Sequence, residues 1–143
     1  MRGLTDMWRA RRGETADTER TGAAAGEGIG ELLAECELLR EQAEQAGIVL
    51  DDSPDSLAAL DQMQPRWRDD PEASEWLGND AGLYLGTVIV RTVPGAVWRV
   101  WPRGNPVVVL PGGRELDVVE IGHGWAADGY PELSAAYAEV RVD

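Results

Sequence analysis

The residues that could carry out covalent chemistry are few in this chain of 143 residues. Its single histidine, His123, lies in the run Gly122-His123-Gly124-Trp125, and a hydrolase would have to pair it with a nucleophile and an orienting acid. None of the four serines lies in a G-x-S-x-G turn, and the chain has no lysine for a Schiff base or a phosphate-binding loop. We therefore expect no catalytic residues, and a surface or interface position for His123.

Candidate metal ligands are equally sparse. One histidine and one cysteine, Cys36, cannot form a zinc site without carboxylates, and no ligand spacing supports one. Carboxylates are concentrated at Asp51, Asp52 and Asp55, but this segment lacks the oxygen spacing and the final glutamate of a calcium-binding EF-hand loop. Helix capping and solvation are the simpler interpretation, so we expect no metal.

Two other patterns in the sequence resemble functional sites. The glycines of Gly112-Gly113-Arg114 do not follow the dinucleotide-binding fingerprint and have no strand-to-helix context, so they indicate a turn and no cofactor. Glu115 and Asp117 lie two residues apart on a predicted strand, and would share a face suitable for acid–base chemistry. A solvated edge strand is the simpler interpretation of this pair.

The tryptophans are the most suggestive feature, since the chain has six. Trp98 and Trp101 lie three residues apart on a predicted strand, so their side chains should point to opposite faces. If only one face is buried, one indole is exposed and could anchor a partner, with Arg99, Arg103 and Arg114 around it. In the alternative interpretation, helices cover both faces or a bulge turns Trp101 inward.

The N-terminal segment carries a second candidate docking element. Its apolar residues recur at helical spacing and are followed by arginines, a pattern that could dock on an anionic membrane surface or a partner. A dozen residues are short for an isolated helix, so local packing of the terminus is the alternative. The residues concerned are Leu4, Met7 and Trp8, followed by Arg9, Arg11 and Arg12. Residues 13–26 show no hydrophobic period, and we expect residues 1–26 to form a flexible tail.

The formal charge of −13 argues against nonspecific binding to nucleic acid, which requires a basic surface. It favours a basic partner, or simply high solubility. Residues 27–70 hold twelve carboxylates against three arginines, so the acidity is concentrated there. No apolar run could span a bilayer, and the N-terminus lacks the apolar region of a secretory signal. We expect a cytoplasmic protein.

The hydrophobic pattern predicts helices before and after a central sheet. An apolar stripe predicts one helix over residues 27–46, ended by Gly47. Ser53-Pro54 begins a second helix, which should end or kink before Pro65. Asp70-Pro71 begins a short helix over residues 71–77, ended by Gly78.

The stretch from residue 76 to residue 119 organises the fold. Residues 80–93 read as a helix capped by Asn79 or Asp80, although their β-branched residues also suit a strand. Gly82 and Gly86 would permit close packing of that helix against a neighbour. Three antiparallel strands follow over residues 96–101, 107–110 and 114–119, and a helical region over residues 121–140 breaks at residues 129–131. We predict an α+β fold with one domain over residues 27–143.

The run LGNDAGLYLGTVIVRTVPGAVWRVWPRGNPVVVLPGGRELDVV resembles the signature of a small actinobacterial family of unknown function. The upstream runs ECELLREQAEQAGIVLDDSPDSLAALDQ and PRWRDDPE are similar to that family too, so the resemblance covers roughly residues 30–140. It implies a helix over residues 80–93 and brings no known activity or catalytic residue. The pattern of helix, strand and turns is more loosely similar to small bacterial domains, some of which are immunity or accessory proteins.

These observations predict a non-enzymatic interaction or accessory protein with a protein partner. The most specific version of this prediction is an immunity-like protein that binds a basic partner. The first alternative is a membrane-peripheral protein that docks through its N-terminal segment. The second is a small-molecule-binding domain using His123 and nearby carboxylates.

Overall fold

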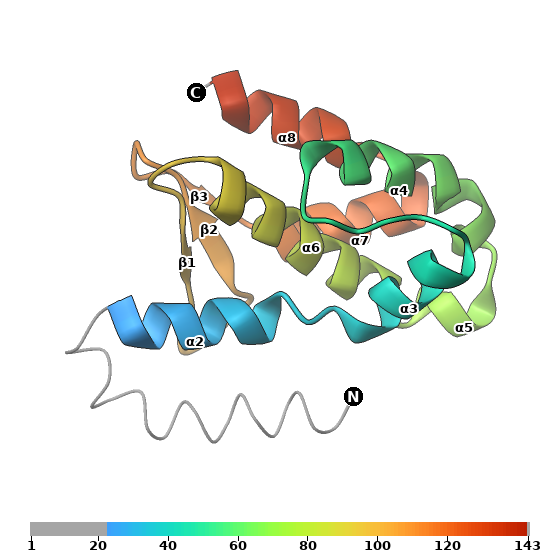
Figure 1. Cartoon of the computed structure of the whole chain (residues 1–143), viewed down its shortest axis with the longest axis horizontal. Helices are drawn as coiled ribbons and strands as arrows, with labels where there is room; N and C mark the ends of the chain where they lie inside the picture. The colour runs from blue at the N-terminus through green and yellow to red at the C-terminus, as the bar shows by residue number, and fades with distance from the viewer. Residues whose placement is uncertain (1–22, 143) are drawn as a thin grey trace.

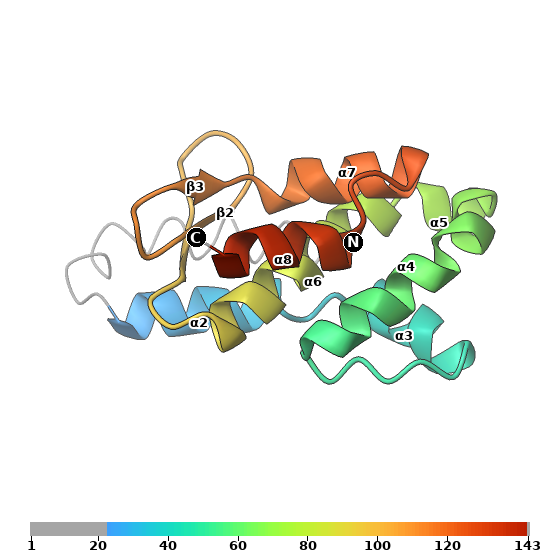
Figure 2. The ribbon, with the colours of Figure 1, turned by 90° about the horizontal axis from the view of Figure 1, so that it is seen from above.

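The computed structural model describes residues 23–142, and within them it has an α+β fold (Figure 1). Seven helices and a three-stranded antiparallel sheet make up this part of the chain, with the sheet at one end and α5 at the other (Figures 1 and 2). In chain order the elements are α2 (Ala23–Leu33), α3 (Glu37–Gln45), α4 (Pro54–Arg68), α5 (Pro71–Ser74), α6 (Leu77–Thr92), β1 (Val97–Arg99), β2 (Val107–Val109), β3 (Glu115–Leu116), α7 (Val118–Asp128) and α8 (Leu133–Val142). Helix α2 thus begins inside the segment predicted as a tail.

Helix α6 is the centre of the molecule. It contacts each of the other described helices and strands β1 and β2, and its residues from Leu77 to Ile89 are buried on all sides except at Asn79. A helix that is surrounded in this way can be apolar around its circumference, which explains why β-branched residues are accommodated. The predicted helix over residues 80–93 is confirmed. Its start is different, because α6 begins at Leu77 without a side-chain cap, and Gly78 lies in its first turn instead of ending the preceding helix.

Glycines allow α6 to pack closely against two neighbours, as the spacing of Gly82 and Gly86 predicted. A Cβ atom added at Gly82 would overlap the backbone of Val118 in α7, and one added at Gly122 would overlap the backbone of α6. A Cβ atom at Gly86 would overlap the ring of Trp98 in β1. Both contacts therefore depend on residues without side chains.

The helix predicted over residues 27–46 is two helices, and that prediction was wrong. The chain breaks at Cys36, which has a left-handed conformation with φ 40°. The break is stabilised by one side chain from α3 and one from α6. The guanidinium of Arg40 donates from Nη2 to the carbonyl of Ala34 (2.9 Å) and from Nε to that of Glu35 (3.1 Å), and a carboxylate oxygen of Asp80 in α6 accepts from the Leu39 amide (3.2 Å). Backbone groups that a continuous helix would satisfy internally are satisfied by these contacts.

Helix α4 continues through Pro65 to Arg68, so the predicted end before the proline was also wrong. The helix starts as predicted, with Ser53 accepting from the Ser56 amide (3.3 Å) and Pro54 in the first turn. A proline inside a helix removes one backbone hydrogen bond. Pro65 lies only three residues from the end of α4, and the extra turn buries Trp67, which is 4% exposed.

The strands pair in the order β1-β2-β3, and both pairings are antiparallel, which confirms the predicted meander. The third strand is shorter than predicted, because Asp117 accepts from the Glu120 amide (3.1 Å) and begins α7 at Val118. Helix α7 ends at Gly129, which has φ 73°, and α8 follows. The carboxylate of Asp61 in α4 accepts from the Leu133 and Ser134 amides at the start of α8 (2.8 and 3.1 Å).

Candidate functional site

Trp98 and Trp101 differ in exposure, but β1 ends at Arg99, so the predicted strand over residues 96–101 is too long and Trp101 lies in the segment that follows the strand. Trp98 points inward, pairs in register with Val108, and packs beside Gly86 of α6 and Gly30 of α2. Trp101 lies on the outer surface and is 43% exposed. Trp98 therefore belongs to the framework, and Trp101 is the exposed indole.

Trp101 is held by two charged residues from the edge strands. Its indole Nε1 donates to Oε1 of Glu115 in β3 (3.0 Å). The guanidinium carbon of Arg99 in β1 lies 5.3 Å from the centre of the Trp101 ring, and Arg99 forms an ion pair with Glu115 (3.6 Å). We call Arg99, Trp101 and Glu115 the Trp101 cluster. Because β2 lies between the two edge strands, the cluster reaches across the outward face of the sheet.

The two valines beside the Trp101 cluster on this face differ in solvent exposure. Val107, the register partner of Arg99, is only 8% exposed although it lies on the same outward face. Val97 on β1 points the same way and is 53% exposed. Cation–π and aromatic contacts of exposed residues contribute roughly 0.5–1 kcal/mol, so they favour this orientation of the Trp101 ring modestly while the ring stays exposed.

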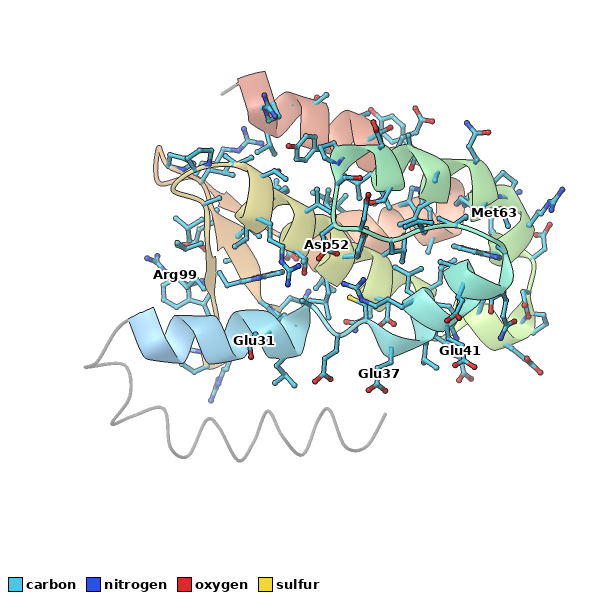
Figure 3. All side chains as sticks on the ribbon, viewed as in Figure 1. Glu31, Glu37, Glu41, Asp52, Met63 and Arg99 are labelled. Carbon is cyan, nitrogen blue, oxygen red and sulfur yellow. The ribbon has the colours of Figure 1, made fainter. Side chains whose placement is uncertain are left out.

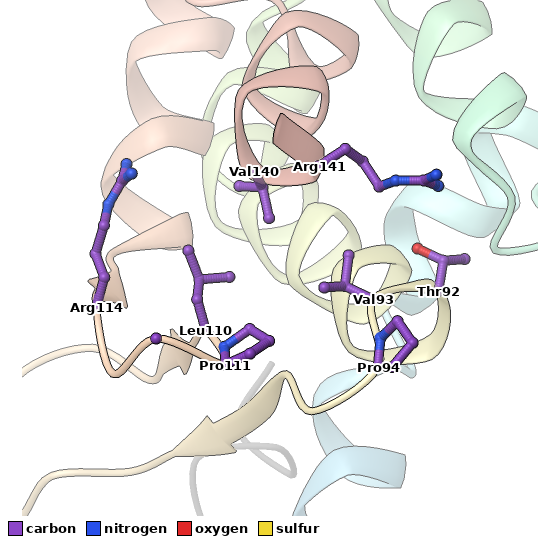
Figure 4. Close-up of a pocket in the computed structure, with 9 residues that line it drawn as sticks. Thr92, Val93, Pro94, Leu110, Pro111, Arg114, Val140 and Arg141 are labelled. Atoms are coloured by element: carbon purple, nitrogen blue, oxygen red, sulfur yellow. The ribbon is translucent and has the colours of Figure 1, made fainter. Parts of the chain in front are cut away.

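The predicted ring of arginines around the exposed tryptophan is only partly assembled. Arg99 contacts Trp101, and its outward position is visible in Figure 3. Arg103 is exposed in the bend that follows β1. Arg114 lies instead on a pocket between the β2–β3 turn and α8, opposite Arg141 (Figure 4). The stretch that includes β1 and β2 is nonetheless basic, because residues 91–114 contain four arginines and no carboxylate, and Glu115 follows at the start of β3.

The other candidate docking residues lie outside the described part of the chain. They are Leu4, Met7, Trp8, Arg9, Arg11 and Arg12, and docking through them stays a prediction. Within residues 23–142, the structure has no helix long and apolar enough to cross a membrane.

The residues weighed for catalysis are not assembled into a reactive site. His123 is exposed on α7, against Gly78 of α6. Cys36 is buried, as predicted, and burial followed by the negative charge of Asp80 raises the pKa of its thiol. Glu115 and Asp117 do not share the face of one strand, the arrangement that acid–base chemistry would need, because Asp117 caps α7 and Glu115 bonds Trp101.

The aspartates at positions 51–55 are used for structure. Asp51 accepts from the amide and hydroxyl of Ser53 (3.2 and 2.5 Å), which lowers its pKa. Asp52 forms ion pairs with Arg40 and Arg91, and its backbone amide donates to the Tyr84 hydroxyl (2.9 Å). Among the described residues, no group of histidine, cysteine or acidic side chains is arranged to hold a metal ion.

Two features of this region escaped sequence reasoning. The sequence suggested acid–base chemistry for Glu115, whereas its carboxylate accepts a hydrogen bond from Trp101. No pattern in the sequence indicated that Arg141 lines a pocket together with Arg114. Glu115 lies 14 residues from Trp101, and Arg141 lies 27 residues from Arg114. No local spacing signals such pairs, because only the pairing of strands and the docking of α8 bring them together.

A family of unknown function, DUF6278, matches residues 2–143. The chain belongs to this family. The DUF6278 match includes every described element and extends over the N-terminal segment as well. No curated protein and no solved structure matches the chain. The family brings no activity, so the functional argument depends on the geometry of this chain.

Proposed function

We propose that this DUF6278 protein is a non-enzymatic interaction protein that docks on a protein partner through the outward face of its sheet. The observation that carries the proposal is Trp101, which is 43% exposed and is held in place by Glu115 and Arg99. Tryptophan and arginine are the residues most enriched at the energetic centres of protein interfaces.

The Trp101 side chain is a suitable anchor because its orientation is already restricted in the free protein. Immobilising a flexible side chain on association costs about 0.5–1.5 kcal/mol. The Trp101 cluster already restricts the ring through one hydrogen bond and one cation–π contact, so part of that cost is met in the free protein. Val97 adds an exposed apolar side chain on the same face.

The test is affinity capture with the full chain as bait. The lysate comes from the native host, which the family resemblance predicts to be actinobacterial. Three baits are compared: wild type, Trp101→Ala and Tyr130→Ala. Tyr130 is the matched control, because it is an aromatic residue that is 79% exposed in the connection between α7 and α8. Trp98 is unsuitable as a surface probe since it packs against α6.

We expect a protein that wild type and Tyr130→Ala retain and Trp101→Ala loses. With that partner purified, Trp101→Ala should weaken binding about tenfold or more, and Tyr130→Ala should leave it unchanged. Equal retention by all three baits would contradict docking through the sheet. Failure of wild type to retain any protein would argue against an interaction role.

A second candidate is an immunity-like inhibitor that binds a basic partner through its acidic helices. Glu37 and Glu41 are exposed on α3 (Figure 3), whereas Glu31 on α2 lies beside Arg91 and Trp98. Charge complementarity of this kind chiefly accelerates association and sets its salt dependence. If this surface is used, Glu37→Arg/Glu41→Arg should slow association with the captured partner, whereas Trp101→Ala should not. If Trp101→Ala weakens binding of the partner and Glu37→Arg/Glu41→Arg leaves its association rate unchanged, the result supports docking on the sheet.

A further inference from the structure

A groove of about 240 Å³ lies between α3 and the segment that carries α5, and α5 is at the end of the molecule away from the sheet (Figure 1). We call it the α3–α5 groove. Its lining consists of Leu38, Glu41, Gln42 and Gln45 on α3, and of Asp70, Glu72, Ala73 and Trp76 from the segment around α5. The volume is below the range of about 300–1,000 Å³ that is typical of sites for whole small molecules. The groove is therefore of a size for one side chain of a partner.

Three carboxylates line the groove, and no basic residue does. Within residues 23–142, Glu41 and Glu72 form no ion pair, and their side chains form no hydrogen bond. One carboxylate oxygen of Asp70 accepts from the Glu72 amide (2.9 Å), and its other oxygen has no partner in that range. Arg68 is the arginine nearest to Asp70 in the sequence, and its Nε lies 3.8 Å from a carboxylate oxygen of Asp69 instead. The groove therefore favours a positively charged group.

The helix termini at the groove do not change its sign. The C-terminal turn of α3 borders the groove through Gln42 and Gln45, and Trp76 precedes the first turn of α6. The first terminus contributes roughly half a negative elementary charge and the second roughly half a positive one. Because these two contributions oppose each other, the carboxylates determine the local charge.

The indole of Trp76 adds an independent preference for a cation. Trp76 is half-buried, and within the described residues its side chain forms neither a hydrogen bond nor a cation–π contact. A tryptophan ring attracts a cation over its face, and the planar guanidinium of arginine also stacks on such a ring. The amide oxygens of Gln42 and Gln45 can accept from its N–H groups. All three kinds of polar or aromatic group in the lining are thus complementary to a guanidinium.

We propose that the α3–α5 groove receives an arginine side chain of a protein partner. The five N–H donors of a guanidinium can bond more than one carboxylate or amide oxygen of the lining at a time, while its plane stacks on Trp76. The inference rests on the second candidate function, the binding of a basic partner by the acidic helices, and gives that candidate a defined point of contact. It is independent of docking through the sheet, because no residue of the Trp101 cluster lines the groove.

The test measures binding of a capped arginine, N-acetyl-arginine N-methylamide, to the full chain by NMR titration of its backbone and indole N–H signals. The capped form presents one arginine side chain as a protein does, without charged ends. The same derivative of citrulline is the matched control ligand, because citrulline is neutral and has nearly the same shape. Free L-arginine distinguishes a metabolite from the side chain of a protein.

Two double variants separate the groove from the general charge of α3. Glu41→Gln/Glu72→Gln removes two carboxylates that line the groove and keeps Asp70, which caps α5. Glu37→Gln/Glu44→Gln removes two exposed charges of α3 that do not line it. Trp76→Leu removes the aromatic ring and keeps an apolar side chain. Circular dichroism and the melting temperature establish that each variant is folded.

We expect wild type to bind capped arginine at least about tenfold more tightly than capped citrulline, since only arginine carries a charge. Glu41→Gln/Glu72→Gln should weaken arginine binding about tenfold, and Glu37→Gln/Glu44→Gln by less than about twofold. Trp76→Leu should weaken it roughly threefold through the loss of the cation–π contact. Free arginine should bind more weakly than capped arginine, because its own carboxylate is repelled by the groove.

Four results would overturn the inference. They are equal binding of capped arginine and capped citrulline, equal weakening by the two double variants, tighter binding of free arginine than of capped arginine, and no binding of capped arginine to folded wild type. A partner whose association is slowed by Glu37→Arg/Glu41→Arg would still support the acidic-helix candidate in each of these cases. Failure of the groove is therefore distinguishable from failure of that candidate.

Discussion

At the scale of single residues, two tryptophans three positions apart have different roles. Trp98 is half-buried and packs beside Gly30 of α2 and Gly86 of α6, and Trp101 lies on the outer surface with Glu115 and Arg99 as charged partners. The indole that packs against a helix contributes to folding. The exposed indole is the one that we propose for recognition.

This difference predicts unequal effects on stability. Trp98→Ala should lower the free energy of unfolding by about 2–3 kcal/mol, since it leaves a cavity against Gly86. Trp101→Ala should lower it by less than about 1 kcal/mol, since it removes an exposed cation–π contact and one hydrogen bond. Urea unfolding of both variants measures the two values. Equal losses would contradict the assignment of Trp98 to the framework and Trp101 to the surface.

Asp80 is a buried carboxyl group within α6, and its pKa is raised above the ordinary value of 3.8 chiefly because burial disfavours its charged form. The folded state therefore binds more protons than the unfolded state between the two pKa values. Over that window the free energy of unfolding falls as the pH rises.

Asp80→Asn should remove this pH dependence. The stability of the variant relative to wild type should increase from about pH 4 toward pH 7, as wild type becomes charged at position 80. Urea unfolding at several pH values gives the difference directly. A difference between variant and wild type that is independent of pH would show that the folded-state pKa is not raised.

At the scale of elements, the packing of α6 against α7 depends on glycine. Alanine normally stabilises a helix interior by roughly 1 kcal/mol relative to glycine. At Gly82 that gain is reversed, because the added methyl group would overlap the backbone of Val118. Glycine at position 82 therefore lowers the local helix propensity but permits close contact between the backbones of α6 and α7.

The matched substitution is in α2, where a Cβ atom at Gly30 would lie in ordinary contact, 3.5 Å from Trp98 Cδ1. We expect Gly30→Ala to raise the melting temperature, and Gly82→Ala to lower the free energy of unfolding by about 1–3 kcal/mol. Thermal and urea unfolding of the pair test this directly. If both substitutions were stabilising, this result would contradict the close contact between the backbones of α6 and α7 at Gly82.

At the scale of the whole molecule, charge is divided between regions. Residues 91–114, which include β1 and β2, carry four arginines and no carboxylate. Residues 23–90, which include α2 to α5, carry 15 carboxylates and three arginines. Repulsion within the acidic helices opposes folding, and salt should screen it because the Debye length falls as ionic strength rises.

The melting temperature should therefore rise between about 0.01 and 0.5 M sodium chloride, where the Debye length falls from about 30 Å to a few ångströms. Glu41→Gln/Glu44→Gln removes two exposed charges from α3 and should reduce the size of that rise. Scanning calorimetry of wild type and the double variant provides the comparison. A melting temperature that falls with salt would indicate that attractive ion pairs outweigh the repulsion.

Local patterns in the sequence determined several features correctly. Ser53-Pro54 and Asp70-Pro71 begin helices where capping rules place them, and the alternation of β1 places Trp98 on the opposite face from Val97 and Arg99. The spacing of Gly82 and Gly86 indicated close helix packing. These features depend on backbone geometry and side-chain direction within a few residues, which the order of amino acids specifies directly.

Only the tertiary structure decided the features that depend on distant residues. The break at Cys36 is stabilised through Asp80, 44 positions away. Glu115 reaches Trp101 across β2, and Arg114 and Arg141 share a pocket because α8 docks beside the β2–β3 turn. Contacts of this kind follow from how the elements pack around α6, and neither periodicity nor capping encodes that arrangement.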